Sequence, residues 1–220
     1  MILSKTDILS RLKEGEITFS PALDGFQLQP HAVDLRLGTE FHIPKTWEIT
    51  KYGRQAISID PLDSQKKKNF EKVELKMGQF FELLPKEAVI GTTYEQIGLH
   101  AKDIMCVLYP RSSINRRGLS VALSGIVDVG YTGHLMIPIV NNTDQQIIRI
   151  YPGERVCQLV FHEISSSLTT EEALLHGLTQ PKYNKAVKGF IAGKSDGRAE
   201  IDLIKAGKIT LLKKKFSIKY

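Results

Sequence analysis

Three short segments in the second half of the sequence carry side chains suited to phosphate chemistry. Pro110-Arg111-Ser112-Ser113 places a guanidinium beside two hydroxyls, and this combination with backbone amides suits phosphate oxygens. Asp128 follows an apolar pair and precedes Gly130, and a lone carboxylate at such a turn is a candidate base for activating water. Gln158 lies in an apolar run, where its amide either binds a ligand or bonds a neighbouring strand. Taken singly, each residue is explained as well by an ordinary loop, turn or strand.

The segments that must position these side chains have the periodicity of β-strands. Alternating or β-rich runs, separated by turn residues, cover residues 17–19, 33–37, 40–43, 56–59, 80–84, 88–93, 104–109, 135–140, 147–151 and 156–164. This pattern predicts a mainly β fold, a sandwich or jelly-roll barrel, and not alternating βα units. One short amphipathic helix is predicted from Thr6 to Glu14, capped by Thr6 or Asp7, and a helical turn from Thr170 to Leu175.

Composition narrows the class of protein. A chain of 220 residues suits one core, and it shows neither a membrane-length apolar stretch nor a signal-peptide layout, which predicts a cytoplasmic protein without a membrane partner. Cys106 and Cys157 lie in apolar runs and are expected to be free buried thiols. The formal charge of +6 suits an anionic partner. We attribute much of it to solvated loops at 66–68 and 213–215, and nucleic acid is not the expected partner.

Order and spacing add a family resemblance. Residues 1–8 and 28–38 resemble the amino-terminal signature of a family of deaminases, and residues 110–113 resemble a phosphate-binding motif that the family shares. Residues 125–133 resemble the motif with the catalytic aspartate, and residues 155–158 resemble the motif before the last core strand. The chain thus resembles the family of trimeric dUTPases and dCTP deaminases, from Met1 to about Gly193. The resemblance implies a distorted β-barrel of the dUTPase-like type, with a short N-terminal helix and a C-terminal extension. It also implies a homotrimer with sites assembled from neighbouring chains.

The resemblance implies a role for each candidate site residue. Asp128 is the expected catalytic residue, which activates water for attack on the α-phosphorus. Phosphate binding is expected from Arg111, Ser112, Ser113, Gln158 and Lys182. Sugar and base binding are expected from Tyr131, from backbone groups around Ser124, Gly125 and Ile126, and from Phe190. Asp34 resembles the acid of the first family motif. Because an acid within a strand is as often structural, Asp34 is not counted among the expected site residues. Mg²⁺, held chiefly by the triphosphate and water, is the expected cofactor.

One position separates the two family activities. In deaminases that resemble this chain, a glutamate ten positions after the aspartate moves protons at the base, and Pro138 stands there in this sequence. Residues 134–141 look like the corresponding strand of trimeric dUTPases. The leading expectation is therefore a dUTP diphosphatase that forms dUMP and pyrophosphate. A dCTP deaminase, alone or bifunctional, is the alternative, and a catalytically inactive nucleotide-binding homologue is a second. Proline in a strand also predicts that Pro138 faces an edge or bulge.

Three regions are expected along the chain. Residues 1–180 would form the β-barrel domain, residues 181–198 a flexible arm that closes over the site, and residues 199–220 a basic extension of unknown role. The extension is predicted to be a hairpin or a helix. The insertion from Thr46 to Lys76 is interpreted as a solvated loop.

Overall fold

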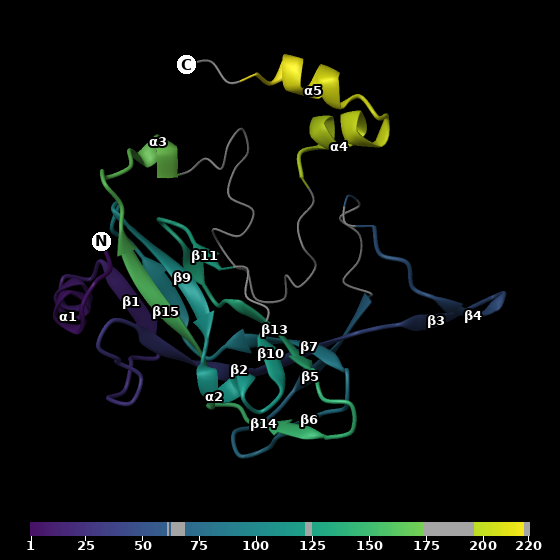
Figure 1. Cartoon of the computed structure of the whole chain (residues 1–220), viewed down its shortest axis with the longest axis horizontal. Coiled ribbons are helices and arrows are strands. Elements are labelled where there is room, and N and C mark those ends of the chain that lie inside the picture. The colour runs from purple at the N-terminus through teal and green to yellow at the C-terminus, as the bar shows by residue number, and fades with distance from the viewer. Residues whose placement is uncertain (61, 63–68, 122–124, 174–195, 218–220) are drawn as a thin grey trace. The chain divides into compact units, whose positions relative to one another are not determined.

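The computed structural model describes residues 1–60, 62, 69–121, 125–173 and 196–217. They form two compact units (Figure 1). The first holds the described residues of Met1–Lys45 and Lys68–Ile191, and the second those of Thr46–Lys67 and Ala192–Tyr220. The mainly β fold with a short N-terminal helix, as expected from the sequence, is confirmed.

The first unit contains nearly all of the strands. In chain order its elements are α1 (Lys5–Lys13), β1 (Ile17–Ser20), β2 (Val33–Pro44), β5 (Phe70–Glu74), β6 (Phe81–Leu83), β7 (Ala88–Thr93), β8 (Gln96–Leu99), β9 (Ile104–Pro110), α2 (Ser112–Asn115), β10 (Leu119–Val121), β11 (Ile126–Val127), β12 (Thr132–Gly133), β13 (Met136–Asn141), β14 (Ile148–Ile150), β15 (Arg155–Glu163) and α3 (Thr170–Ala173). The main sheet has the order β10-β13-β7-β2-β15-β9-β11, with β5 also paired to β2. Smaller sheets join β1-β8-β12 and β14-β6, and the described pairings are antiparallel.

Strand β2 runs unbroken through Gly38, although turn residues were expected to separate the predicted runs at 33–37 and 40–43. The two strands predicted at 33–37 and 40–43 are one strand, and the pairing with β7 shifts register between Leu37 and Phe41. Gly38 lies at this irregularity, where an added Cβ would approach Thr92 Oγ1 to 2.8 Å. The glycine therefore permits close approach of two strands rather than a reversal of the chain.

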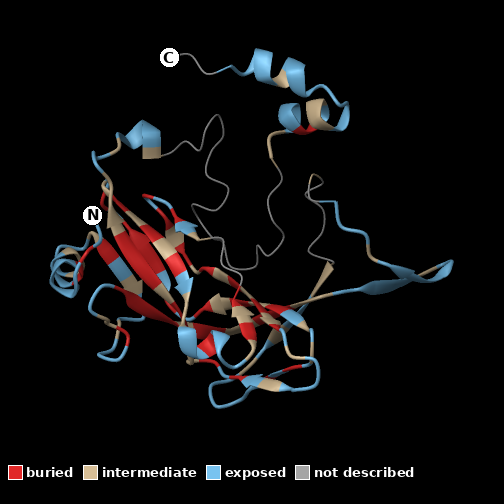
Figure 2. Ribbon diagram, in the orientation of Figure 1, coloured by how far each residue is buried: buried red, intermediate tan, exposed pale blue. Residues whose placement is uncertain are grey.

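Alternation along the strands builds the core. In β13 the buried residues Ile137, Ile139 and Asn141 alternate with partly exposed ones, and β15 is buried over most of its length (Figure 2). The rings of Phe41 and Phe81 stack with centroids 5.2 Å apart in this core. Burial of alternate side chains on one face is what holds the strand register.

Pro138 lies inside the main sheet. β13 is flanked by β7 and β10, so it is not an edge strand, whereas the sequence predicted that Pro138 faces an edge or bulge. Pro138 pairs with Ile90 of β7, and the described part of the β10 pairing covers Ile139 to Asn141. On the β10 side, the described ladder therefore needs no N–H from Pro138.

The N-terminal helix is confirmed, but its cap differs from the prediction. Ser4 is the N-cap, and its Oγ accepts a hydrogen bond from the Asp7 amide at 3.3 Å. The Asp7 carboxylate accepts one from the Ser4 amide at 3.0 Å, which completes a capping box. Because a capping box pairs the N-cap residue with the residue three positions later, Ser4 with Asp7 forms the box, and Ser4, not Thr6 or Asp7, is the N-cap.

The second unit contains a β-hairpin and two helices. β3 (Trp47–Thr50) pairs with β4 (Gly53–Ala56), so this part of the insertion from Thr46 to Lys76 is not a plain loop. The C-terminal extension is helical, with α4 (Arg198–Lys205) and α5 (Ile209–Lys215). Among the helices in the described ranges, none has the length and apolar character needed to cross a bilayer.

Both thiols are free and buried, as expected, and they should be unreactive in the folded protein. Burial raises the pKa of Cys157 to about 12 and the pKa of Cys106 well above its usual value. Because the thiolate is the reactive form, we expect Ellman's reagent at about pH 8 to label neither thiol in the native state and both in urea. Rapid labelling of the native protein would contradict this arrangement.

Candidate functional site

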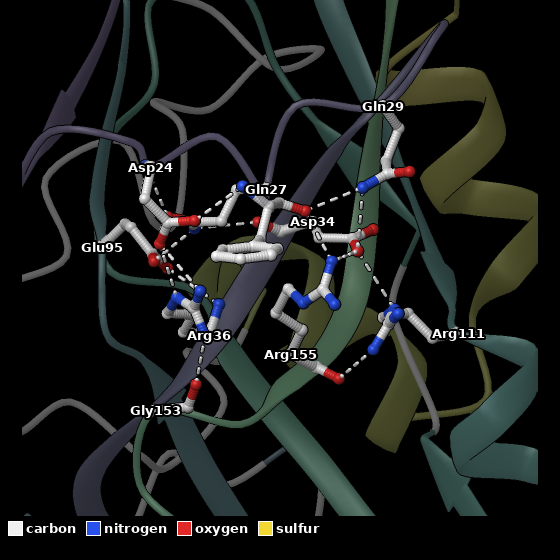
Figure 3. A network of polar contacts seen from close by, with 10 residues as sticks. Asp24, Gln27, Gln29, Asp34, Arg36, Glu95, Arg111, Gly153 and Arg155 are labelled. Carbon is white, nitrogen blue, oxygen red and sulfur yellow. Dashed lines mark hydrogen bonds and ion pairs between the residues drawn. The ribbon is translucent and has the colours of Figure 1, made fainter.

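Arg111 is held by a buried carboxylate. It follows the last residue of β9 and immediately precedes α2, so its backbone leaves the sheet at this point. Its Nε forms an ion pair with Asp34 Oδ2 on β2 at 3.1 Å, and Arg155 Nη1 donates a hydrogen bond to the same oxygen at 3.1 Å (Figure 3). Arg111 Nη1 also donates to the Arg155 carbonyl at 3.0 Å. Asp34 and Arg155 therefore hold the Arg111 guanidinium in place.

The charge of this cluster favours an anion. Asp34 is 2% exposed, and burial raises the pKa of its carboxyl, while Arg111 and Arg155 act in the opposite direction. One carboxylate between two guanidiniums leaves one positive charge uncompensated within the cluster. A phosphate oxygen is a suitable partner for the remaining donors of an arginine whose position is already set.

A second layer of hydrogen bonds supports the cluster. Buried Glu95 accepts from Gln27 Nε2 at 2.7 Å and from the Arg36 amide at 3.0 Å, and burial raises the pKa of its carboxyl. The Arg36 side chain donates to Asp24 Oδ2 at 2.7 Å and to the Gly153 carbonyl at 2.7 Å. Figure 3 shows these groups beside the Asp34 cluster, so the loop before β2 is tied to the site.

Four of the five predicted phosphate-binding residues belong to this region. Gln158 of β15 stands opposite Asp34 of β2 in the register, which places the two side chains on the same face of the sheet. Ser112 and Ser113 directly follow Arg111 and are exposed in α2. Lys182 lies outside the described residues. We call Asp34, Arg111, Ser112, Ser113 and Gln158 the arginine half-site.

Asp128 lies on a tight turn. It directly follows β11, and its carbonyl accepts a hydrogen bond from the Tyr131 amide at 3.1 Å. Gly130 occupies the third position of this turn with φ 78°, a conformation that favours glycine. The Asp128 side chain is exposed to solvent. We call Asp128 with the turn 128–131 the aspartate half-site.

The predicted sugar and base ligands near this turn are placed unevenly. Gly125 has φ 82°, its carbonyl accepts from the Leu108 amide at 2.7 Å, and Ile126 is 61% exposed. Tyr131 is buried, its hydroxyl donates to the His134 carbonyl at 2.9 Å, and burial raises its pKa to about 12. Packing of Tyr131 on a sugar stays a prediction. Ser124 and Phe190 lie outside the described residues.

A single chain does not bring the two half-sites together. β11 is antiparallel to β9, with Ile126 opposite Val107 and Val127 opposite Cys106. Asp128 continues past the Cys106 end of this pairing, whereas Arg111 lies five residues beyond Cys106 at the other end, roughly 17 Å along an extended strand. The register therefore separates the candidate base from the candidate phosphate ligand.

No protein cage for a metal is present in the part of the chain that the structure describes. That part contains no group of three or more His, Cys, Asp or Glu side chains placed to hold an ion. Asp34, the buried acid of the site, is already bonded to two arginines. Mg²⁺ fits this donor set only as an ion carried by the phosphates of a ligand and by water.

Two residues that build the site were not predicted from the sequence. Arg155 shares Asp34 with Arg111, and Glu95 joins the loop before β2 to the backbone of Arg36. Arg155 lies within the motif at residues 155–158, so the sequence indicated the region of the site to which it belongs, but not its ion pair with Asp34. Glu95 gives no signal in the sequence, because its contacts come from residues far away in the chain.

Together, the sheet and the two half-sites define a mainly β protein. Arg111, held by an ion pair, and Asp128, on a turn, lie near opposite ends of strand β9. Residues 2–164 match the model of the dCTP deaminase-like family, and the chain belongs to this family. The family places it among enzymes of nucleotide metabolism.

Curated relatives match over almost their whole length. A protein of Dictyoglomus thermophilum named dCTP deaminase, dUMP-forming, is 35% identical over 93% of this chain and 98% of its own. A protein of Methanopyrus kandleri with the same name is 33% identical over 87% of this chain and 99% of its own. The crystal structure of the Agrobacterium tumefaciens 2'-deoxycytidine 5'-triphosphate deaminase aligns with TM-score 0.56 and 23% identity, over 73% of this chain and 48% of that one, which supports the fold.

These relatives correct the leading functional expectation. The prediction of a dUTP diphosphatase is contradicted, because the relatives are named as dUMP-forming dCTP deaminases. The prediction gave one residue, Pro138, more weight than the similarity of the rest of the chain. The alternative of a dCTP deaminase agrees better with the relatives.

Removing the central carboxylate should destabilise the protein. We expect Asp34→Ala to lower the free energy of unfolding by about 3 kcal/mol, because two partly buried guanidiniums lose their counter-charge. Asp144→Ala is the matched control, since Asp144 is 83% exposed in an ion pair with Lys86 and should cost under about 1 kcal/mol. Urea unfolding of both variants measures the difference, and equal effects would refute a central role for Asp34.

Proposed function

We propose that this protein is a dUMP-forming dCTP deaminase, which consumes dCTP and two waters and releases ammonia and pyrophosphate. The observation that carries the proposal is the similarity to a dUMP-forming relative across 93% of this chain and 98% of the relative. That span includes both half-sites. The enzyme would act in the cytoplasm, where deoxynucleotides are made. The two free thiols agree with this location, because disulfides are rare there.

The arginine half-site would bind the triphosphate. Arg111 is held by Asp34 and carries donors beyond those that Asp34 and the Arg155 carbonyl use. Ser112 and Ser113 add two exposed hydroxyls next to it. Because Asp34 sets the position of the guanidinium before the ligand arrives, little side-chain entropy would be lost on binding.

The aspartate half-site would have to come from a neighbouring chain. Within one chain the antiparallel register places Asp128 and Arg111 at opposite ends of β9. A closed three-fold assembly would bring Asp128 of one chain toward Arg111 of the next. We therefore propose a homotrimer with three shared sites.

Two bonds would be broken in the proposed reaction. One water adds to C4 of cytosine, and the amino group leaves as ammonia. A second water attacks the α-phosphorus, the bond to the bridging oxygen of the β-phosphate breaks, and pyrophosphate leaves. Asp128 would take the proton of this second water. Mg²⁺ bound through the phosphates would offset their negative charge.

Pro138 favours a second candidate, a protein that binds the nucleotide without turnover. Proline has no carboxylate, and Leu135, Met136, Ile137 and Ile139 around it on this segment carry no titratable group either. Deamination needs a group that moves protons at the base. If the protein is a deaminase, another side chain must move protons at the base. If it only binds the nucleotide, no side chain needs to do so.

A product assay separates the two candidates. We expect purified protein with Mg²⁺ and dCTP to release ammonia, pyrophosphate and dUMP in equal amounts. Asp128→Asn should retain nucleotide binding and lose pyrophosphate release by about 10²-fold or more. Asp144→Asn, an exposed aspartate outside both half-sites, is the control. Tight dCTP binding without products would favour the second candidate, and pyrophosphate from dUTP with no ammonia from dCTP would overturn the proposal.

Restoring a carboxylate at the proline position should raise deamination. We expect Pro138→Glu to increase ammonia release from dCTP by about 10²-fold, because a positioned general acid–base group contributes on that scale. Pro138→Gln removes the proline without adding an acid and serves as the matched control. Equal rates for the two variants would show that this position does not limit proton transfer.

A further inference from the structure

The excess positive charge of the chain is confined to the second unit. The ranges 46–67 and 192–220 contain 12 Lys and Arg against 6 Asp and Glu, whereas the remainder of the chain contains 18 of each. The first unit, with both half-sites, is therefore neutral, and the second carries the whole formal charge of +6. This partition is not explained by the binding of dCTP in the first unit.

The hairpin of the second unit exposes aromatic rings beside cations. Trp47 is 46% exposed and Tyr52 is 76% exposed. The Arg54 guanidinium carbon lies 4.6 Å from the Trp47 ring centroid, and Lys51 Nζ lies 4.8 Å from that of Tyr52. Figure 2 shows β3 and β4 coloured almost wholly as exposed, and the described strands add no third strand to this pair. A hairpin without a covering layer normally gains stability from a partner.

The helices of the second unit add a cationic run. α4 ends at a turn in which Gly207 has φ 69°, and Ile201 is the residue of this helix pair that is buried. From Lys205 to Tyr220 the sequence contains no Asp or Glu, and α5 ends with Lys213, Lys214 and Lys215 exposed. Lys205 pairs with Asp60 at 3.1 Å, whereas the three terminal lysines of α5 make no ion pair among the described residues.

We propose that the second unit is a binding module for single-stranded nucleic acid. Lys213, Lys214 and Lys215 would contact phosphates, and unpaired bases would stack on Trp47 and Tyr52. A positively charged surface combined with exposed aromatic rings is how proteins bind single strands without sequence preference. We favour a nucleic acid over an anionic membrane because the exposed rings of the hairpin lie beside cations, an arrangement that suits stacking on bases next to phosphates. The proposal revises the expectation that nucleic acid is not a partner, which treated the lysine runs as solvated loops.

Trp47 is the only tryptophan of the chain, so its fluorescence reports on the hairpin directly. We expect titration of the full-length protein with an oligothymidine of about 20 nucleotides to quench this fluorescence through base stacking. The logarithm of the affinity should fall linearly with the logarithm of salt concentration. Lys213→Gln/Lys214→Gln/Lys215→Gln should lower that slope by about 2, at about 0.7 per lost phosphate contact.

Two controls make the test decisive. Lys5→Gln/Lys13→Gln/Lys76→Gln removes the same charge from exposed positions of the first unit and should leave affinity and slope unchanged. Saturating dCTP should not displace the oligonucleotide, whatever the outcome of the product assay. Equal loss in both triple variants, displacement by dCTP, or binding to phosphatidylserine vesicles but not to the oligonucleotide would each overturn the proposal.

Discussion

The buried pairing of Asp34 with Arg111 and Arg155 is the interaction on which the rest of the site depends. A carboxylate that is 2% exposed is costly to bury, and two guanidiniums at 3.1 Å offset that cost. The same contacts join the ends of β2, β9 and β15, so the ion cluster also holds three strands of the sheet together. The arginine that would bind phosphate is thereby positioned by the fold and not by its ligand.

The antiparallel register imposes the second constraint. Pairing of β11 with the first half of β9 sends Asp128 away from Arg111. No side-chain rotation can close a gap of more than roughly 17 Å. The separation gives a physical reason for a shared site, because two chains can juxtapose groups that one chain keeps apart.

Pro138 shows how a single residue and a whole sequence can support different functions. Proline carries no carboxylate at the position where the family resemblance led us to expect a glutamate, yet the similarity to relatives named dUMP-forming dCTP deaminase extends through nearly the whole chain. Chemistry depends on the few atoms at the reacting bond, whereas fold and binding depend on many residues. The proline therefore bears on turnover more directly than on membership of the family.

The sequence by itself determined the local elements and the types of the site residues. Alternation predicted strands such as β7 and β15, and the order of motifs singled out Arg111, Asp128 and Gln158. Only the tertiary structure decided that Gly38 lies within a strand, that Asp34 anchors two arginines, and that the net charge gathers in one unit. Local periodicity follows from neighbours in the chain, but these three features follow from contacts between residues far apart in it, which no local pattern encodes.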